Sequence, residues 1–118
     1  MTTFQRAPTR TLEASEAISK HLRVKVLAAG TAAIAGAADS DIGTSASYAH
    51  DAGDEVAVDI ASLEGTERGI AAVAIDIGDK LYGAADGEIG KTNTNAPIGI
   101  AMSAAGAGDV VEFVRRQI

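Results

Sequence analysis

The chain has 118 residues, a formal net charge of −6, and neither cysteine nor tryptophan. This length is enough for one domain with one core. The acidic balance argues against a nucleic-acid-binding protein, because phosphate binding needs clustered lysine and arginine. The absence of cysteine excludes disulfides and thiolate metal sites. With 25 alanines, 13 glycines and four aromatic residues, each contact buries little area, so we expect stability to be gained by association with further copies or a larger partner.

The most apolar stretch, residues 26–38, is interrupted by glycines and is well short of the roughly 20 residues that span a bilayer. The first ten residues lack the apolar run of a signal peptide. We therefore expect a soluble protein that is made in a cytoplasm and has no membrane partner.

Residues 1–11 show neither a helical nor a strand period and are predicted to form an extended arm. Residues 12–118 are predicted to form a single β-rich domain. The residues of the arm that could contact a partner are Thr2, Thr3, Phe4, Gln5, Arg6, Pro8, Thr9 and Arg10.

Strict alternation of apolar and polar residues marks two strands in the first half of the chain, at 21–26 and 54–60. The inward-facing residues would be Leu22, Val24, Val26, Val56, Val58 and Ile60. The outward-facing residues of the first strand would be His21, Arg23 and Lys25. Between the two strands, glycines interrupt the helical tendency of alanine, which predicts a turn at 28–30, a short strand at 32–35 and a turn at 37–40. Residues 13–19 fit either a short strand or one helical turn.

In the second half, residues 62–70 are polar with two glycines and are predicted to be a loop, for which an extended conformation is an alternative. Residues 71–77 fit a short helix or a buried strand equally well. Lys80–Tyr82 and Glu88–Lys91 are predicted to pair as a hairpin, because Asp86-Gly87 supplies a position with positive φ. A strand at 98–103, a glycine-rich turn at 104–109 and a last strand at 110–116, with Val111 and Phe113 on one face, complete the chain.

A weak internal repeat links residues 41–60 with residues 97–116. Both stretches run Ile-Gly, a short spacer, Ala-Gly-Asp, and then valine alternating with a second residue. Aspartate can accept backbone hydrogen bonds at a corner, and glycine permits a positive φ. The repeat predicts two similar hairpins, each made of a strand, a tight corner and a returning strand.

The stretch Gly87–Thr92, GEIGKT, ends like a nucleotide-binding P-loop. A P-loop needs a glycine where this sequence has Ala85, and a helix after the loop to face the phosphates. The residues that follow, 92–97, are typical of a loop instead. We therefore interpret GEIGKT as the outgoing strand of the predicted hairpin.

Other constellations that could carry chemistry are weak. His21 and His50 stand apart, and Ser47, His50 and Asp51 are too close along one turn to form a relayed triad. Asp39-x-Asp41-x-Gly43 starts like a calcium loop, but Thr44 and His50 occupy the positions that need Gly and Glu. The glycine-flanked aspartates are better explained as turn residues. We expect no enzymatic activity, cofactor or metal.

The C-terminal half resembles the capsid cement, or head decoration, proteins of tailed bacteriophages. The resemblance lies in the order of short features over residues 75–116. These features are Ile77–Tyr82, Asp86-Gly87, Thr92–Asn95, Ile98–Ala101, Ala107–Asp109 and Val110–Val114. The middle of the chain is similar to the first half of that family, so the resemblance covers about residues 18–116, but the N-terminal arm does not match it.

The resemblance implies a mainly β fold, a small β-barrel-like or β-sandwich-like domain with short hairpins and at most one short helix. It also implies a homotrimer on the outer capsid surface of the virion, whose arms at residues 1–11 add strands to the major capsid protein. Such a protein would stabilise the shell across the joints between capsomers. A tail or baseplate β-module, or a small ligand-binding domain that uses the Asp/Gly loops, remains an alternative.

Overall fold

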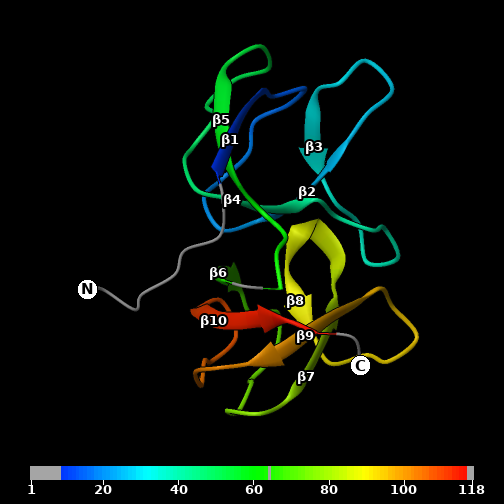
Figure 1. Ribbon diagram of the computed structural model, residues 1–118, viewed down its shortest axis with the longest axis vertical. Helices are drawn as coiled ribbons and strands as arrows, with labels where there is room; N and C mark the ends of the chain where they lie inside the picture. The colour runs from blue at the N-terminus through cyan, green and yellow to red at the C-terminus, as the bar shows by residue number, and fades with distance from the viewer. Residues whose placement is uncertain (1–8, 64, 117–118) are drawn as a thin grey trace.

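Figure 1 shows a computed structural model of the protein, which describes residues 9–63 and 65–116. The described residues form two five-stranded antiparallel sheets. The first sheet contains β1 (Thr9–Glu13), β2 (Arg23–Val26), β3 (Ala32–Ile34), β4 (Gly43–Ser45) and β5 (Glu55–Ile60). The second contains β6 (Thr66–Ile70), β7 (Lys80–Gly83), β8 (Ile89–Gly90), β9 (Pro97–Ala101) and β10 (Val110–Arg115). A short 3-10 turn, η1 (Ala85–Gly87), joins β7 to β8.

The predicted mainly β class is confirmed. Within the described ranges, the only helical element is the three-residue turn η1. The sheets are sandwich-like and do not close into a barrel; the first lies above the second in the view of Figure 1.

The two sheets have the same topology. Their strand orders are β1-β5-β4-β2-β3 and β6-β10-β9-β7-β8, so each strand of the first sheet has a counterpart in the second. Short bridges outside the strands are repeated as well. They are Ala14–Ala32 and Ile18–Ala49 in the first half, and Ala71–Ile89 and Ile75–Ala105 in the second. The chain is therefore built from two copies of one structural unit.

The two hairpins that the internal repeat predicted are confirmed as β4–β5 and β9–β10, each an antiparallel pair. The structure extends this similarity beyond the matched letters to the whole of each half. Outside the matched stretches, the two halves share strand pairing and buried positions. Different side chains can occupy the same buried position, so the sequence alone did not predict this part of the repeat.

Each sheet packs its own core. Val56 and Val58 of β5 are fully buried in the first cluster, and Val111 and Phe113 of β10 are fully buried in the second. These four residues confirm the alternation that the sequence predicted for both strands. The clusters are made of Ala, Val, Ile and Leu with a single Phe, so each core is thin.

The predicted turns around β3 and between β7 and β8 are also confirmed. Gly30 has a φ of 83° in the turn before β3. Asp86 and Gly87 both have positive φ, 60° and 74°, and β7 pairs with β8 across them. GEIGKT therefore runs from this turn through β8 into further turns, as the hairpin interpretation requires.

The predicted facing of the first alternating strand is wrong at two positions. Arg23 is fully buried, whereas Val26 is 46% exposed. Periodicity assigned Arg23 to solvent because it treats a charged residue as exposed. In the structure its side chain leaves the first sheet toward the second half, where it finds polar partners.

In three further segments the structure differs from the sequence prediction or from both of the alternatives that the sequence allowed. Residues 66–70, predicted as a loop, form the strand β6 because β10 supplies its backbone partners. Residues 13–19 and 71–77 form neither a helical turn nor a complete strand. Instead, isolated bridges hold them at Ala14, Ile18, Ala71 and Ile75.

Candidate functional site

The predicted arm lies only in part within the described residues. Thr2, Thr3, Phe4, Gln5, Arg6 and Pro8 lie outside them. Thr9 and Arg10 are exposed residues of β1, which is an edge strand of the first sheet. Since β1 pairs with β5 from Thr9 onward, the predicted boundary at residue 11 falls inside a strand. Any detached arm is therefore limited to residues 1–8.

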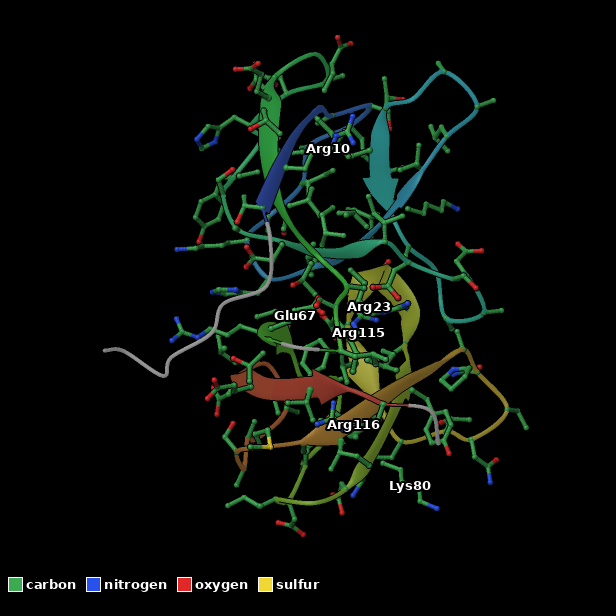
Figure 2. The ribbon with its side chains drawn as sticks, viewed as in Figure 1. Arg10, Arg23, Glu67, Lys80, Arg115 and Arg116 are labelled. Carbon is green, nitrogen blue, oxygen red and sulfur yellow. The ribbon has the colours of Figure 1, made fainter. Side chains whose placement is uncertain are left out.

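A buried network of charged side chains joins the two sheets (Figure 2). Arg115 of β10 donates to both carboxylate oxygens of Glu67, at 2.8 and 2.9 Å. The same guanidinium donates to both oxygens of Asp41, at 3.1 and 2.6 Å. Arg115 also lies 5.3 Å from the centre of the Phe113 ring, a cation–π contact. Two paired carboxylates therefore hold one guanidinium in a nearly dry space.

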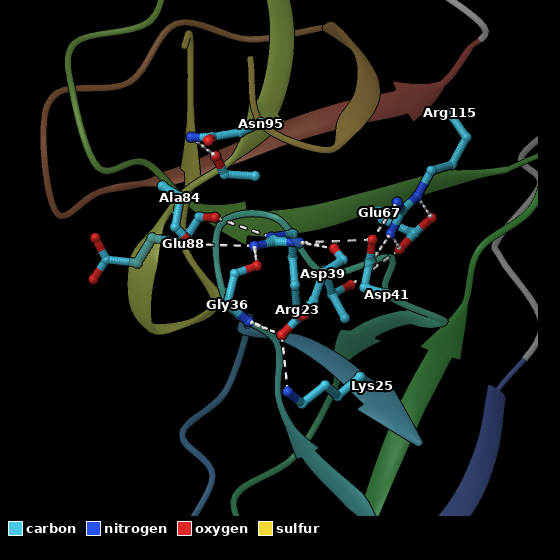
Figure 3. A network of polar contacts seen from close by, with 12 residues as sticks. Arg23, Lys25, Gly36, Asp39, Asp41, Glu67, Ala84, Glu88, Asn95 and Arg115 are labelled. Carbon is cyan, nitrogen blue, oxygen red and sulfur yellow. Dashed lines mark hydrogen bonds and ion pairs between the residues drawn. The ribbon is translucent and has the colours of Figure 1, made fainter. Parts of the chain in front are cut away.

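Arg23 occupies the centre of the same network (Figure 3). It comes from the first sheet and donates to the carbonyl oxygens of Glu88 and Ala84 in the second half, at 3.0 Å each. It also donates to the carbonyls of Gly36 and Asp39, at 2.8 and 3.3 Å. Its guanidinium lies 3.8 Å from Asp41. Arg23 therefore fastens loops of both halves to each other.

Burial and the neighbouring carboxylates act in opposite directions on the pKa values of the two guanidinium groups in this network. Burial lowers the pKa of Arg115, but the hydrogen bonds that its guanidinium donates to Glu67 and Asp41 outweigh this effect and raise that pKa above its ordinary value. Burial lowers the pKa of Arg23, and Asp41 opposes part of the shift. Two cations thus balance two carboxylates. The network therefore links side chains and loops of the two halves.

A polar cavity opens at the seam between the two sheets, beside the network. Its volume is about 260 Å³, below the range of about 300–1,000 Å³ that is usual for small-molecule sites. The residues that line it are Lys20, His21, Ala46, Asp59, Thr66, Glu67, Arg68 and Glu112. We refer to it as the seam cavity. It is the most developed candidate site in the described part of the chain.

The sequence did not single out the seam cavity, because its residues come from separated segments. The sequence marks His21 as an isolated histidine and as an outward-facing strand residue, and it places Lys20 and Arg68 in no motif. Comparison of the two copies of the structural unit singles out His21, because the residue at the equivalent position of the second copy is Gly78. The backbone N–H of His21 donates to Ser45 O, as that of Gly78 does to Ala101 O.

The seam cavity makes stability depend on His21 protonation. Burial, then the positive charges of Lys20 and Arg68, lower the pKa of His21, while Asp59 opposes them. A lowered folded pKa means that the unfolded chain binds the proton more tightly. The contribution of His21 to the free energy of unfolding is therefore complete above pH 6.5, the ordinary pKa of histidine. It is lost as the pH falls below that value.

We expect the His21→Asn variant to lose less stability than the wild type when pH falls from above to below 6.5. Asparagine is chosen because it tolerates the left-handed backbone at this position, where φ is 69°. The measurement is the urea midpoint of both proteins on either side of that pH. An equal loss in both proteins would contradict a role for His21 in the pH dependence.

The glycine-flanked aspartates act as turn residues. Asp39 accepts the Gly36 N–H and the Lys25 ammonium, both at 2.8 Å. The hydrogen bond from Lys25 is the largest cause of a lowered pKa at Asp39. Asp79 accepts the Asp76 N–H in the same way, at 2.8 Å. Within the described ranges, no group of three or more histidines and carboxylates is placed to hold a metal ion.

Two other observations concern residues outside the seam cavity and the elements of the fold. His50 stacks on Tyr48 with 6.2 Å between the ring centres, and neither residue lines the seam cavity. The described residues include no helix with the length and hydropathy needed to cross a membrane.

The fold is similar to a solved phage structure. No known family model matches this chain, and no curated protein matches its sequence. The chain can be superposed on the N base of head fiber gp8.5 in bacteriophage phi29 with a TM-score of 0.78. The match covers 92% of this chain and 93% of that one at 20% sequence identity. At this identity the likeness establishes a shared fold: two antiparallel sheets arranged as in the base of a phage head fiber.

Proposed function

We propose that this protein is a structural component of a bacteriophage virion that binds the outside of the head and stabilises the shell. The observation that carries the proposal is the similarity in fold to the base of a phi29 head fiber along almost the full length of both chains. The resemblance of residues 75–116 to capsid cement proteins independently suggests the same place on the virion. The protein would act without catalysis.

The proposed mechanism is the addition of buried interface across the joints between capsomers. The partner is the major capsid protein, and the protein binds it as a homotrimer. Thin cores like the two described above favour assembly, because association buries further apolar area. Residues 1–8 would pair with a sheet edge on the shell, where backbone hydrogen bonds give affinity with little demand on sequence.

The arm can strengthen binding only if the free energy gained from its contacts exceeds the free-energy cost of the conformational entropy that is lost when it becomes ordered. Fixing each residue costs roughly 1–2 kcal/mol, so a short arm must form many hydrogen bonds and use its one large apolar anchor, Phe4. Three arms on one trimer would act together, because the second and third bind at a high effective concentration.

Deleting residues 1–8 should reduce binding to undecorated, expanded heads by at least about tenfold, while the melting temperature stays unchanged. The deletion stops before β1, so the pairing of β1 with β5 remains intact. The measurement is co-sedimentation of purified protein with heads.

The matched control replaces residues 1–8 with a Gly-Ser segment of equal length and should bind between the deletion and the full chain, because it keeps the backbone groups but lacks the Phe4 anchor. Undiminished binding by the deletion variant would exclude the arm. Failure of the full chain to bind any head would exclude decoration. A few copies located at the tail, rather than many over the head, would support a tail module instead.

A further inference from the structure

The seam cavity combines a free strand edge with unpaired positive charge. We propose that it binds an extended acidic peptide segment, which adds a strand to β6 and places a carboxylate among Lys20, His21 and Arg68. This inference goes beyond decoration of the head and does not depend on it, because it concerns a site within the isolated chain.

The first support is the free edge of β6. Among residues 9–63 and 65–116, this strand stands at the end of the second sheet and pairs only with β10. Ala71 N donates to Asp109 O just beyond the ladder, and the alternation of antiparallel pairing then directs the peptide groups of Arg68 away from β10. Thr66, Glu67 and Arg68 all line the cavity. A peptide that enters there meets backbone groups ready to pair.

The second support is the distribution of charge. Neither Lys20 nor Arg68 forms an ion pair with a described residue. The carboxylates of the cavity, in contrast, already accept hydrogen bonds within the protein. Glu67 accepts from Arg115 and Thr44, Glu112 from the Thr66 hydroxyl at 2.9 Å, and Asp59 from the Thr9 hydroxyl at 3.0 Å. Next to His21, the positive charges of Lys20 and Arg68 outweigh the negative charge of Asp59, so this part of the cavity favours an acidic group.

The third support comes from comparing the two copies of the structural unit. His21 and Gly78 are counterparts with φ of 69° and 89°. Glycine adopts this backbone without strain, whereas histidine does not. The preceding residues are Lys20 and Ile77. The first copy thus has Lys-His where the second has Ile-Gly, and a strained histidine lies at the cavity. Retained strain of this kind marks functional sites.

The size of the cavity agrees with a peptide. About 260 Å³ accommodates a side chain and its backbone rather than a large cofactor. The strand edge continues beyond it along β6, so neighbouring residues of an extended segment would lie on the surface.

The test uses the full chain and a synthetic peptide of alternating glutamate and threonine. Fluorescence polarisation measures its affinity. Two peptides serve as matched probes: one with glutamine at every glutamate, and one with alternate N-methylated amides that cannot form strand hydrogen bonds. We expect both to bind at least about tenfold more weakly, because a charge-assisted or backbone contact is lost in each.

Protein variants locate the site. Lys20→Gln and Arg68→Gln should each weaken binding of the acidic peptide about tenfold. His21→Gly should also weaken binding, yet raise the melting temperature, because glycine relieves the backbone strain. Lys80→Gln, on an exposed residue of β7 outside the cavity, is the matched control and should bind as the wild type does.

Several outcomes would overturn the proposal. It fails if the wild type does not bind the acidic peptide, or if the glutamine peptide binds equally well. It also fails if the N-methylated peptide binds unchanged, or if His21→Gly melts higher but retains full affinity. Head binding is measured separately, so a failure here leaves the decoration proposal standing.

Discussion

Replacing Arg115 with methionine should reduce the free energy of unfolding by about 3–5 kcal/mol. The variant leaves Glu67 buried, with a side chain that is 1% exposed, and removes both of its guanidinium bonds. Asp41 loses its closest partner and keeps only the longer contact with Arg23. A buried charge without a partner is costly because water no longer solvates it. Since small domains are stable by only about 5–15 kcal/mol, urea unfolding will detect the change easily.

Arg116→Met provides the matched control. Arg116 is the next residue along the chain and is exposed, and its side chain donates only to carbonyl oxygens. We expect a change of less than about 0.5 kcal/mol. The double variant R115M/E67M should recover part of the loss, because apolar side chains can replace a buried ion pair. A loss below about 1 kcal/mol for Arg115→Met would mean that the network does not hold the sheets together.

Replacing Gly99 with alanine should destabilise the protein by at least about 3 kcal/mol. A Cβ at this position would overlap the carbonyl oxygen of Val114 and lie 2.9 Å from its carbon. These atoms belong to the backbone of β10, which cannot move aside without breaking the β9–β10 ladder. The displacement would also shift Arg115, whose Cα would lie 3.0 Å away. The measurement is the shift in the urea midpoint.

Gly90→Ala is the control for this substitution. The nearest atom to a Cβ there is the Ala84 Cβ at 3.5 Å, an ordinary contact. We expect a neutral effect or a gain of up to about 1 kcal/mol, because alanine restricts the unfolded chain. Equal losses of stability in Gly90→Ala and Gly99→Ala would show that close packing against β10 is not the reason why position 99 requires glycine.

The same close approach explains why Ile-Gly recurs in the two halves. Gly43 faces the backbone of Asp59 in the first sheet as Gly99 faces Val114 in the second. The sequence showed the recurrence, but it could not show that a neighbouring strand requires it. Two hairpins were predicted from the repeat, whereas the structure contains two whole sheets of equal topology.

The seam cavity was beyond prediction for a related reason. Lys20, Asp59 and Arg68 come from three segments that local patterns treat separately. Arg23 was likewise assigned to solvent by the rule that charged residues are exposed, which fails where carbonyl groups from another segment surround a guanidinium.

Local chemistry along the chain was sufficient to specify the β class, the buried faces of β5 and β10, and the turn at Asp86-Gly87. Each of these depends on neighbours within a few residues: a period of two, or a backbone that needs a positive φ. The strand β6, the burial of Arg23 and the meeting of the two sheets were decided only in three dimensions. They depend on partners far along the chain, and the free energy of such contacts exists only once both segments are brought together.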